Sequence, residues 1–173
     1  MRKLLWLLLF GVLALALSSC ILVVDLPVSN FRFDSNWRRT SDGAFVFCTN
    51  PDRETYMRYS FRAPDANRIL SITEIYKGKI SGRELRINRQ KSNLTYASGR
   101  YTFVGRLTFG EGGVPQSLQP FSIVVVPDMP PPVNTNPPDP SKNGETEVTV
   151  EVVSTAGVTY RGTYTYDTYA NCP

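Results

Sequence analysis

The sequence contains no histidine, and only three of its 173 residues are cysteines. The absence of histidine excludes the most common general base, the Ser-His and Cys-His nucleophile pairs, and the usual zinc and iron sites. Any catalysis would depend on carboxylates or on a lysine nucleophile. The acidic residues nearest to a carboxylate pair or a calcium loop are Asp34, Asp42, Asp52 and Glu54, and their spacing matches neither pattern. We therefore predict no catalytic residue, no metal site and no cofactor.

The first twenty residues have the three parts of a secretory signal. Basic residues at positions 2 and 3 precede an apolar run over residues 4–17. The signal segment then closes with Leu17-Ser18-Ser19-Cys20. This segment resembles the signal peptide and lipobox of bacterial lipoproteins. The resemblance implies that residues 1–19 are removed and that diacylglycerol is attached to the thiol of Cys20. Membrane lipid would then hold the mature chain outside the cytoplasm.

An uncleaved anchor is the alternative, because residues 4–24 carry no charge and are long enough, at roughly 20 residues, to span a bilayer as a helix. In either case the body of the protein faces away from the cytoplasm. In cells with two membranes, lipoproteins of this kind stay at the inner membrane mainly when aspartate follows the cysteine. Here Ile21 follows Cys20. The resemblance therefore implies the periplasmic face of the outer membrane in such an organism.

Removal of residues 1–19 leaves 154 residues, which suits one domain with its own core. We expect residues 20–30 to form a membrane-proximal tether or edge strand and residues 31–173 to form the single domain. The domain retains Cys48 and Cys172, and a cysteine pair in an exported chain indicates a disulfide. Two buried thiols are the alternative. Metal binding is disfavoured because the domain has no third cysteine and no histidine.

Turn-forming residues recur about every ten residues, and the intervals between them are rich in β-branched and aromatic residues. This pattern predicts an all-β fold. Residues 55–62 and 101–109 both alternate apolar with polar side chains, and Gly105 indicates a bulge or a close approach. Residues 81–90 begin like a helix cap, but the spacing of their apolar residues favours a strand. Further strands are expected at residues 21–24, 44–48, 69–76, 84–88, 121–126, 146–154 and 158–167.

About eight short antiparallel strands in a chain of this length fit a β-sandwich best, with Ig-like general architecture, and a small β-barrel second. Residues 146–154 and 158–167 are predicted to form a hairpin in which a valine row and a tyrosine row pack inward. Residues 127–140 contain seven prolines, which predicts an extended polyproline II or disordered spacer, with a crossover packed on the sheet or a docking motif as the alternatives. The hairpin is too small to be stable alone and should rejoin the preceding strands.

Charge is distributed unequally along the chain. Residues 31–106 carry fifteen Lys and Arg against seven Asp and Glu, a net charge of +8, and residues 107–173 carry two against seven, a net charge of −5. This division indicates either an anionic partner or pairing between the two halves. The densest basic cluster is a candidate surface for anionic lipid head groups or envelope polymers, with a solvated strand face as the alternative: Lys77, Lys79, Arg83, Arg86, Arg89 and Lys91.

Trp37 is the only tryptophan outside the signal segment. It is either a core or rim residue or, with Arg38 and Arg39, part of a patch that faces carbohydrate or lipid. No aromatic residues are interleaved with the basic cluster, so we do not expect nucleic acid as a partner.

The sequence therefore predicts a non-enzymatic, membrane-anchored envelope lipoprotein that acts through its surface in binding or assembly. Its expected partners are membrane lipid, through the acylated Cys20, and an envelope protein or an anionic envelope polymer. Two alternatives remain open. One is a small barrel that binds an apolar ligand, and the other is a carboxylate-dependent hydrolase of envelope glycans.

Overall fold

The computed structural model describes residues 27–50, 52–80, 82–109, 122–135, 142–170 and 172. The predicted signal, the lipid attachment residue Cys20 and the expected strand at residues 21–24 lie outside these residues. Within the described residues, no helix is long and apolar enough to cross a membrane. The first strand begins at Ser29, so the last two residues of the segment expected to form a tether or edge strand, residues 20–30, belong to a strand.

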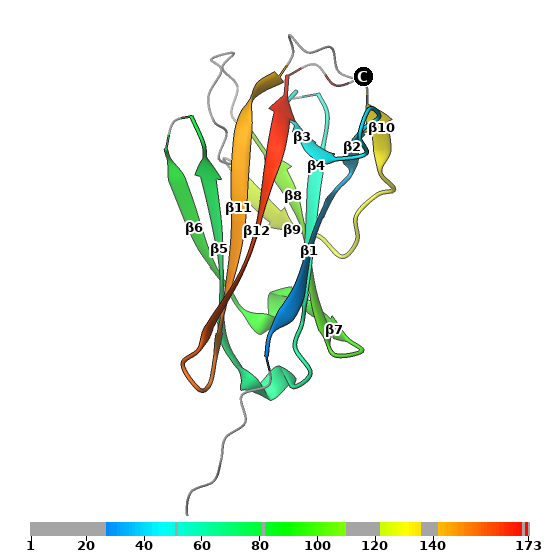
Figure 1. The fold of residues 1–173 in the computed structure, drawn as a ribbon. Helices are drawn as coiled ribbons and strands as arrows, with labels where there is room; N and C mark the ends of the chain where they lie inside the picture. The colour runs from blue at the N-terminus through cyan, green and yellow to red at the C-terminus, as the bar shows by residue number, and fades with distance from the viewer. Residues whose placement is uncertain are drawn as a thin grey trace, which may run out of the picture.

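The described residues form a β-sandwich of two sheets (Figure 1). The five-stranded sheet has the order β1-β4-β8-β7, with β9 also paired to β8. Its strands are β1 (Ser29–Ser35), β4 (Thr55–Arg62), β7 (Thr95–Ala97), β8 (Arg100–Thr108) and β9 (Ser122–Val125). The two sheets do not close into a barrel, so the sandwich is confirmed as the fold and the barrel is wrong.

The seven-stranded sheet has the order β10-β2-β3-β12-β11-β5-β6. Its strands are β2 (Trp37–Arg39), β3 (Phe45–Cys48), β5 (Ile69–Gly78), β6 (Glu84–Arg89), β10 (Val133–Thr135), β11 (Lys142–Ser154) and β12 (Thr159–Tyr169). Two short 3-10 helices, η1 (Ala66–Arg68) and η2 (Lys91–Asn93), lie in connections that cross from one sheet to the other. Every stretch predicted as a strand within the described residues is a strand, including Glu84–Arg89, where a helix competed.

The two ends of the sandwich differ, and we name them by the strands that start or stop there (Figure 1). The base is the end at which β1 begins and β11 turns into β12, and it comprises residues 27–32, 62–70, 90–100 and 154–160. The distal end is the opposite one, where β12 ends and where β3 is joined to Cys172.

Two of the strand pairings are parallel, which the sequence did not predict. β12 runs parallel to β3, and β10 runs parallel to β2. β10 corrects the prediction for the proline-rich segment, because Val133, Asn134 and Thr135 pair with the three residues of β2 in place of a wholly unpaired loop. The strand fits this segment because it uses three of the four residues between Pro132 and Pro137, whose N–H groups are free to enter a ladder.

The core lies between the sheets and is dominated by aromatic side chains. Alternation in β4 directs Met57, Tyr59 and Phe61 inward, and all three are fully buried, as the sequence predicted. The inward residues of β8 meet them across the sheet: the rings of Tyr59 and Phe103 stack with their centroids 5.0 Å apart. The interior of the sandwich is therefore filled by side chains, whose burial supplies the main stabilisation of the fold.

Glycine permits close packing at two places in this core. A Cβ atom on Gly105 would lie 2.7 Å from the ring of Phe103, so the predicted close approach is confirmed, and the pairing of β8 with β4 passes Gly105 without a bulge. A Cβ atom on Gly162 would lie 2.3 Å from the ring of Phe31. This absence of a side chain lets β1 pack against β12 and cover the flank of the sandwich.

The hairpin of β11 and β12 has the predicted arrangement. Val148 lies opposite Tyr164 and Val152 lies opposite Tyr160, with the valines fully buried. The turn between the strands uses Gly157 at a φ of 80°, a conformation that favours glycine. β11 also pairs with β5 along most of its length, so the hairpin rejoins the preceding strands as predicted.

Candidate functional site

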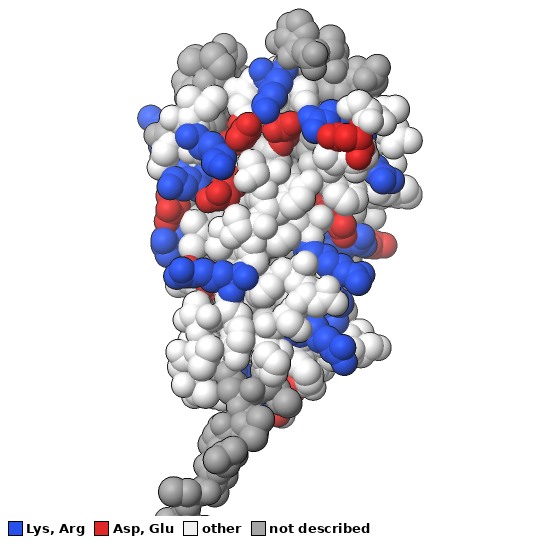
Figure 2. Space-filling model, in the orientation of Figure 1, with Lys and Arg blue, Asp and Glu red and all other residues white. Residues whose placement is uncertain are grey.

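The predicted basic cluster does not form one surface. Lys77, Lys79, Arg83 and Arg86 lie on β5, β6 and the turn between them at the distal end, whereas Lys91 lies in η2 at the base. Two of the distal cations have carboxylate partners: the ammonium of Lys79 lies 3.8 Å from Glu147, and Arg86 pairs with Glu84. On the face shown in Figure 2, most acidic side chains lie toward the distal end with basic side chains beside them.

Arg89, the sixth residue of the cluster, points into the sandwich. Its guanidinium donates from Nε and Nη2 to the two carboxylate oxygens of Glu74, over 2.8 and 2.9 Å. Glu74 is fully buried and also accepts hydrogen bonds from the hydroxyls of Tyr59 and Tyr76, at 2.8 and 2.9 Å. The Arg89 guanidinium lies over the ring of Phe103, 4.6 Å from its centroid. Arg89 is therefore a residue of the core and not of an anion-binding surface.

This buried network links the two sheets, because Tyr59 and Phe103 belong to one sheet and Glu74, Tyr76 and Arg89 to the other. Burial, and then the charge of Glu74, raises the pKa of both tyrosines well above 10, so both remain neutral donors. Burial by itself would lower the pKa of Arg89, but the hydrogen bonds and charge of Glu74 raise it. Each carboxylate oxygen of Glu74 has two donors, so the network holds the core together and leaves no acceptor for a ligand.

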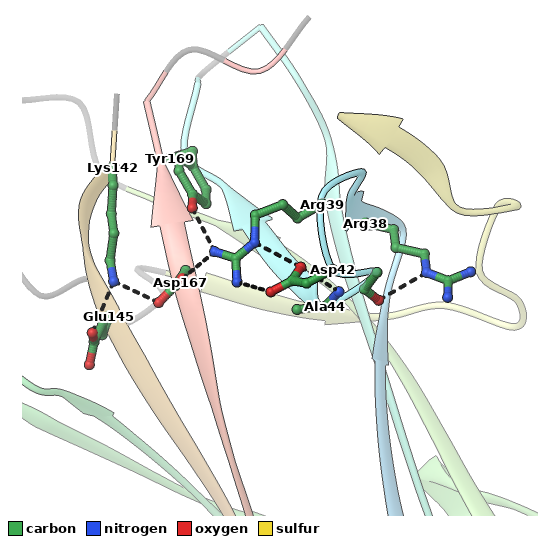
Figure 3. Close-up of polar contacts among 9 residues, drawn as sticks. Arg38, Arg39, Asp42, Ala44, Lys142, Glu145, Asp167 and Tyr169 are labelled. Carbon is green, nitrogen blue, oxygen red and sulfur yellow. Dashed lines mark hydrogen bonds and ion pairs between the residues drawn. The ribbon is translucent and has the colours of Figure 1, made fainter. Parts of the chain in front are cut away.

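A second charge network crosses the outer face of the seven-stranded sheet near the distal end (Figure 3). Arg39 of β2 pairs with Asp42 in the following turn and donates to Asp167 of β12 over 2.6 Å. The ammonium of Lys142 on β11 lies 2.8 Å from Asp167 and 3.0 Å from Glu145. Acidic and basic groups thus alternate along the chain of contacts, which joins the β2–β3 hairpin to β11 and β12.

The electrostatics of this network favour the charged forms of Arg39, Asp42 and Asp167. The hydrogen bond from Arg39 lowers the pKa of Asp42, and the bond to Asp42 raises the pKa of Arg39. Burial would raise the pKa of Asp167, but Lys142 and Arg39 lower it. Arg39 and Asp167 belong to the basic and acidic halves of the sequence, as do Lys79 and Glu147, so pairing between the halves is confirmed at these contacts.

Three of the four carboxylates considered as a catalytic pair are engaged by arginines, and one of them, Asp34, lies on β1 and not in a loop as predicted. Asp34 pairs with Arg58 over 2.8 Å, and Glu54 pairs with Arg106 over 2.8 Å. The pKa of Glu54 is lowered, first by the hydroxyl of Tyr56 and then by Arg106. A lowered pKa favours the ionised form, which cannot act as a general acid.

Glu54 and Arg106 line a distal cavity of about 350 Å³, beside Cys48, Thr49 and Phe109. The cavity size suits a small ligand. Two of its three charged side chains, Glu54 and Arg106, form the ion pair described above, and the third is Arg53. No group of three His, Cys, Asp or Glu that could hold a metal ion occurs in the described part of the chain.

Trp37 and the cysteine pair form a small second core next to this cavity. Trp37 is 5% exposed, and its indole donates to the backbone oxygen of Glu54 over 3.1 Å. Trp37 is therefore a buried residue of this small core and not a carbohydrate platform. Arg38 lies apart from it, with its Nε donating to the backbone oxygen of Gly43. Cys48 and Cys172 lie within disulfide-bonding distance, with Cα atoms 5.9 Å apart, as the sequence predicted.

The base carries a group of arginines that sequence reasoning missed. Arg62 of β4 lies directly opposite Arg100 of β8, and Arg32 of β1 lies near both. Arg100 donates to the hydroxyl of Ser60 over 2.8 Å and to the backbone oxygen of Asn30 over 3.2 Å. Burial and then repulsion by Arg32 and Arg62 lower the pKa of Arg100. Among the described residues, no carboxylate forms an ion pair with any of the three, and we call them the arginine triad.

The alternation of residues 55–62 already placed Arg62 on the solvent face, but only the register of β4 against β8 and β1 reveals that three arginines converge. Like charges on directly opposite residues destabilise a sheet. An anionic partner bound at the triad would therefore relieve the repulsion between its arginines.

Comparison with known proteins gives no family assignment: no protein-family model, no curated protein and no solved structure matches this chain.

Proposed function

We propose that this protein is a lipid-anchored component of the cell envelope, attached to the outer side of a membrane through an acylated Cys20. Its β-sandwich serves in binding or assembly and is not an enzyme. In a cell with two membranes it is located on the periplasmic face of the outer membrane. Its partners are membrane lipid and an envelope protein or anionic polymer.

The pairing of Cys48 with Cys172 is the observation that carries this proposal. Disulfides persist in exported proteins and are rare in the cytosol, so the pair supports the compartment that the lipobox resemblance implies. The position of β1, the first described strand, gives further support. The described chain enters the sandwich at the base, which leaves the distal end, with its cavity and its charge network, directed away from the anchor.

The arrangement of charged groups supports a role without catalysis. Asp34, Asp42 and Glu54 are each held by an arginine, and Glu74 is enclosed by two tyrosines and Arg89. The contacts of Asp42 and Glu54 lower the pKa of both carboxyls and so favour their ionised forms, whereas a glycoside hydrolase needs one carboxylic acid that stays protonated. The filled interior likewise gives no support to a barrel that carries an apolar ligand.

The proposal is tested by following maturation in cells with a labelled fatty acid. The wild-type protein should incorporate the label and shorten by 19 residues, whereas Cys20→Ser should remain an unlabelled precursor. Ser19→Ala, which keeps a small residue before the cysteine, is the matched control and should mature normally. Normal maturation of Cys20→Ser, or failure of the wild type to take up label, would refute the lipid anchor.

The role in binding is tested by photo-crosslinking in living cells. A crosslinkable residue in place of Arg53, which lines the distal cavity, should capture a specific envelope partner. The same residue in place of Arg161, on the outer face of the sheet, is the control. Hydrolysis of envelope glycans by the purified protein, lost in Glu54→Gln, would instead support the hydrolase and contradict the proposal.

A further inference from the structure

The base of the sandwich is strongly basic. It contains five cationic residues, Arg32, Arg62, Arg68, Lys91 and Arg100, and one acidic residue, so its net charge is +5 − 1 = +4. That acidic residue, Asp65, pairs with Arg68. The arginine triad lies on the outer face of the five-stranded sheet at this end, and no described carboxylate neutralises it.

The base also exposes two large aliphatic side chains, in addition to Tyr96, which is 39% exposed. Leu70 is 65% exposed at the start of β5, and Val158 is 44% exposed at the turn between β11 and β12. The two segments lie side by side, because Ser154 pairs with Ile69 and its N–H donates to the backbone oxygen of Val158 over 2.9 Å. Basic groups together with exposed aliphatic side chains match the chemistry of a bilayer interface, which offers anionic head groups and acyl chains.

The tether places this end within reach of the membrane. Only eight residues separate Cys20 from Ser29, the first residue of β1, and the nine Cα–Cα steps between the two span at most about 30 Å. The distal end is separated from Ser29 by the length of β1 and its neighbours, so the base is the end that the anchor holds closest to the lipid.

We propose that the base is a docking surface for anionic phospholipid head groups of the bilayer in which the lipid anchor is inserted. The triad binds the head-group phosphates, and Leu70 and Val158 enter the interfacial layer. This inference rests on the proposed lipid anchor. Docking fixes the orientation of the sandwich, so that its distal end is presented to a partner and does not move freely about the tether.

The test measures how close each end lies to the lipid. The lipidated protein, purified from cells, is reconstituted into vesicles that contain phosphatidylglycerol or phosphatidylcholine alone, each with a spin label on the lipid head group. A fluorophore is attached at Ala156→Cys in the base or at Asp52→Cys in the distal loop between β3 and β4. Quenching of the fluorophore reports contact with the head groups.

We expect strong quenching at position 156 in phosphatidylglycerol vesicles and little quenching at position 52. Each arginine near an anionic surface shifts the ratio of docked to undocked protein by about five-fold, so Arg32→Gln, Arg62→Gln and Arg100→Gln together should lower it by about 100-fold. Salt at 1 M, which shortens the screening length to about 3 Å, should also abolish the quenching. Neutralising Arg53, Lys77 and Arg86 at the distal end removes the same charge and should leave quenching unchanged.

Three outcomes would overturn the docking surface. They are equal quenching in both kinds of vesicle, a triad variant that behaves as wild type, and a distal variant that loses as much quenching as the triad variant. The triad substitutions remove a repulsion, so the variant should keep its folding transition, which thermal unfolding verifies. Protein that floats with the vesicles but shows no quenching contradicts docking alone. If the protein purified from cells carries no lipid and does not float with the vesicles, that result contradicts the anchor as well.

Discussion

Replacing the buried carboxylate by an amide, Glu74→Gln, should destabilise the fold severely. Glu74 is fully buried and faces the guanidinium of Arg89, whose side chain is only 9% exposed. The amide keeps the shape of the side chain but not its charge, and it turns an NH₂ group toward donors. Removing one partner of a buried ion pair costs about 3–5 kcal/mol, because the other charge remains without compensation. In a domain of this size the melting temperature would then fall by roughly 6–20 °C.

The assay is urea and thermal unfolding of the oxidised protein. Glu84→Gln is the matched control, because Glu84 is an exposed carboxylate that pairs with Arg86 of the same strand, β6. Its loss should change stability by less than about 0.5 kcal/mol. Glu74→Gln combined with Arg89→Met should cost less than the sum of the two single changes, because the double variant no longer buries an unpaired charge. A loss below about 1 kcal/mol in Glu74→Gln, or strictly additive single changes, would refute this reasoning.

Further predictions follow from the buried tyrosines, from one glycine and from the cysteine pair. Burial raises the pKa of Tyr59 and Tyr76 well above 10, and an unfolded tyrosine ionises near pH 10, so stability should fall above about pH 10 by about 1.4 kcal/mol per pH unit for each tyrosine. Urea unfolding from pH 8 to pH 11 checks this, and constant stability over that range would contradict it. Gly162→Ala should cost about 1–3 kcal/mol, recovered in part by Phe31→Leu, because the new methyl group meets the ring of Phe31. Full stability in Gly162→Ala would mean that β1 does not pack there. Reducing the cysteine pair, whose sequence separation is 124 residues, should lower the unfolding free energy by about 5 kcal/mol, and an unchanged urea midpoint after reduction would argue against a bond.

The sequence predicted the sandwich well because its strongest signals are local. Alternation alone identified β4 and β8 and the face that each one buries, and the valine and tyrosine rows identified the last hairpin. Four strands were not predicted. Three of them, β2, β7 and β10, have only three residues each, and the buried positions of the fourth, β1, depend on packing against β12. The two parallel pairings depend on contacts between distant segments, which a local pattern does not encode.

The candidate sites were harder to predict for the same reason. The basic cluster was found as a run in the sequence, but strand alternation directs Arg89 inward. Lys91 lies in η2, beyond the end of β6, and so is at the opposite end of the molecule from Lys79. The arginine triad comes from three strands that lie far apart in the sequence, so only the register brings it together. The unequal charge likewise left two interpretations, an anionic partner or pairing between the halves, and did not indicate that Arg39 and Asp167 make a contact.

The most direct test of the central claim is the intact mass of the protein taken from its native cells. The account predicts a chain that begins at Cys20, carries diacylglycerol on the thiol and retains one disulfide between Cys48 and Cys172. A chain that still contains residues 1–19, or one that begins at Cys20 without lipid and with two free thiols, would contradict it.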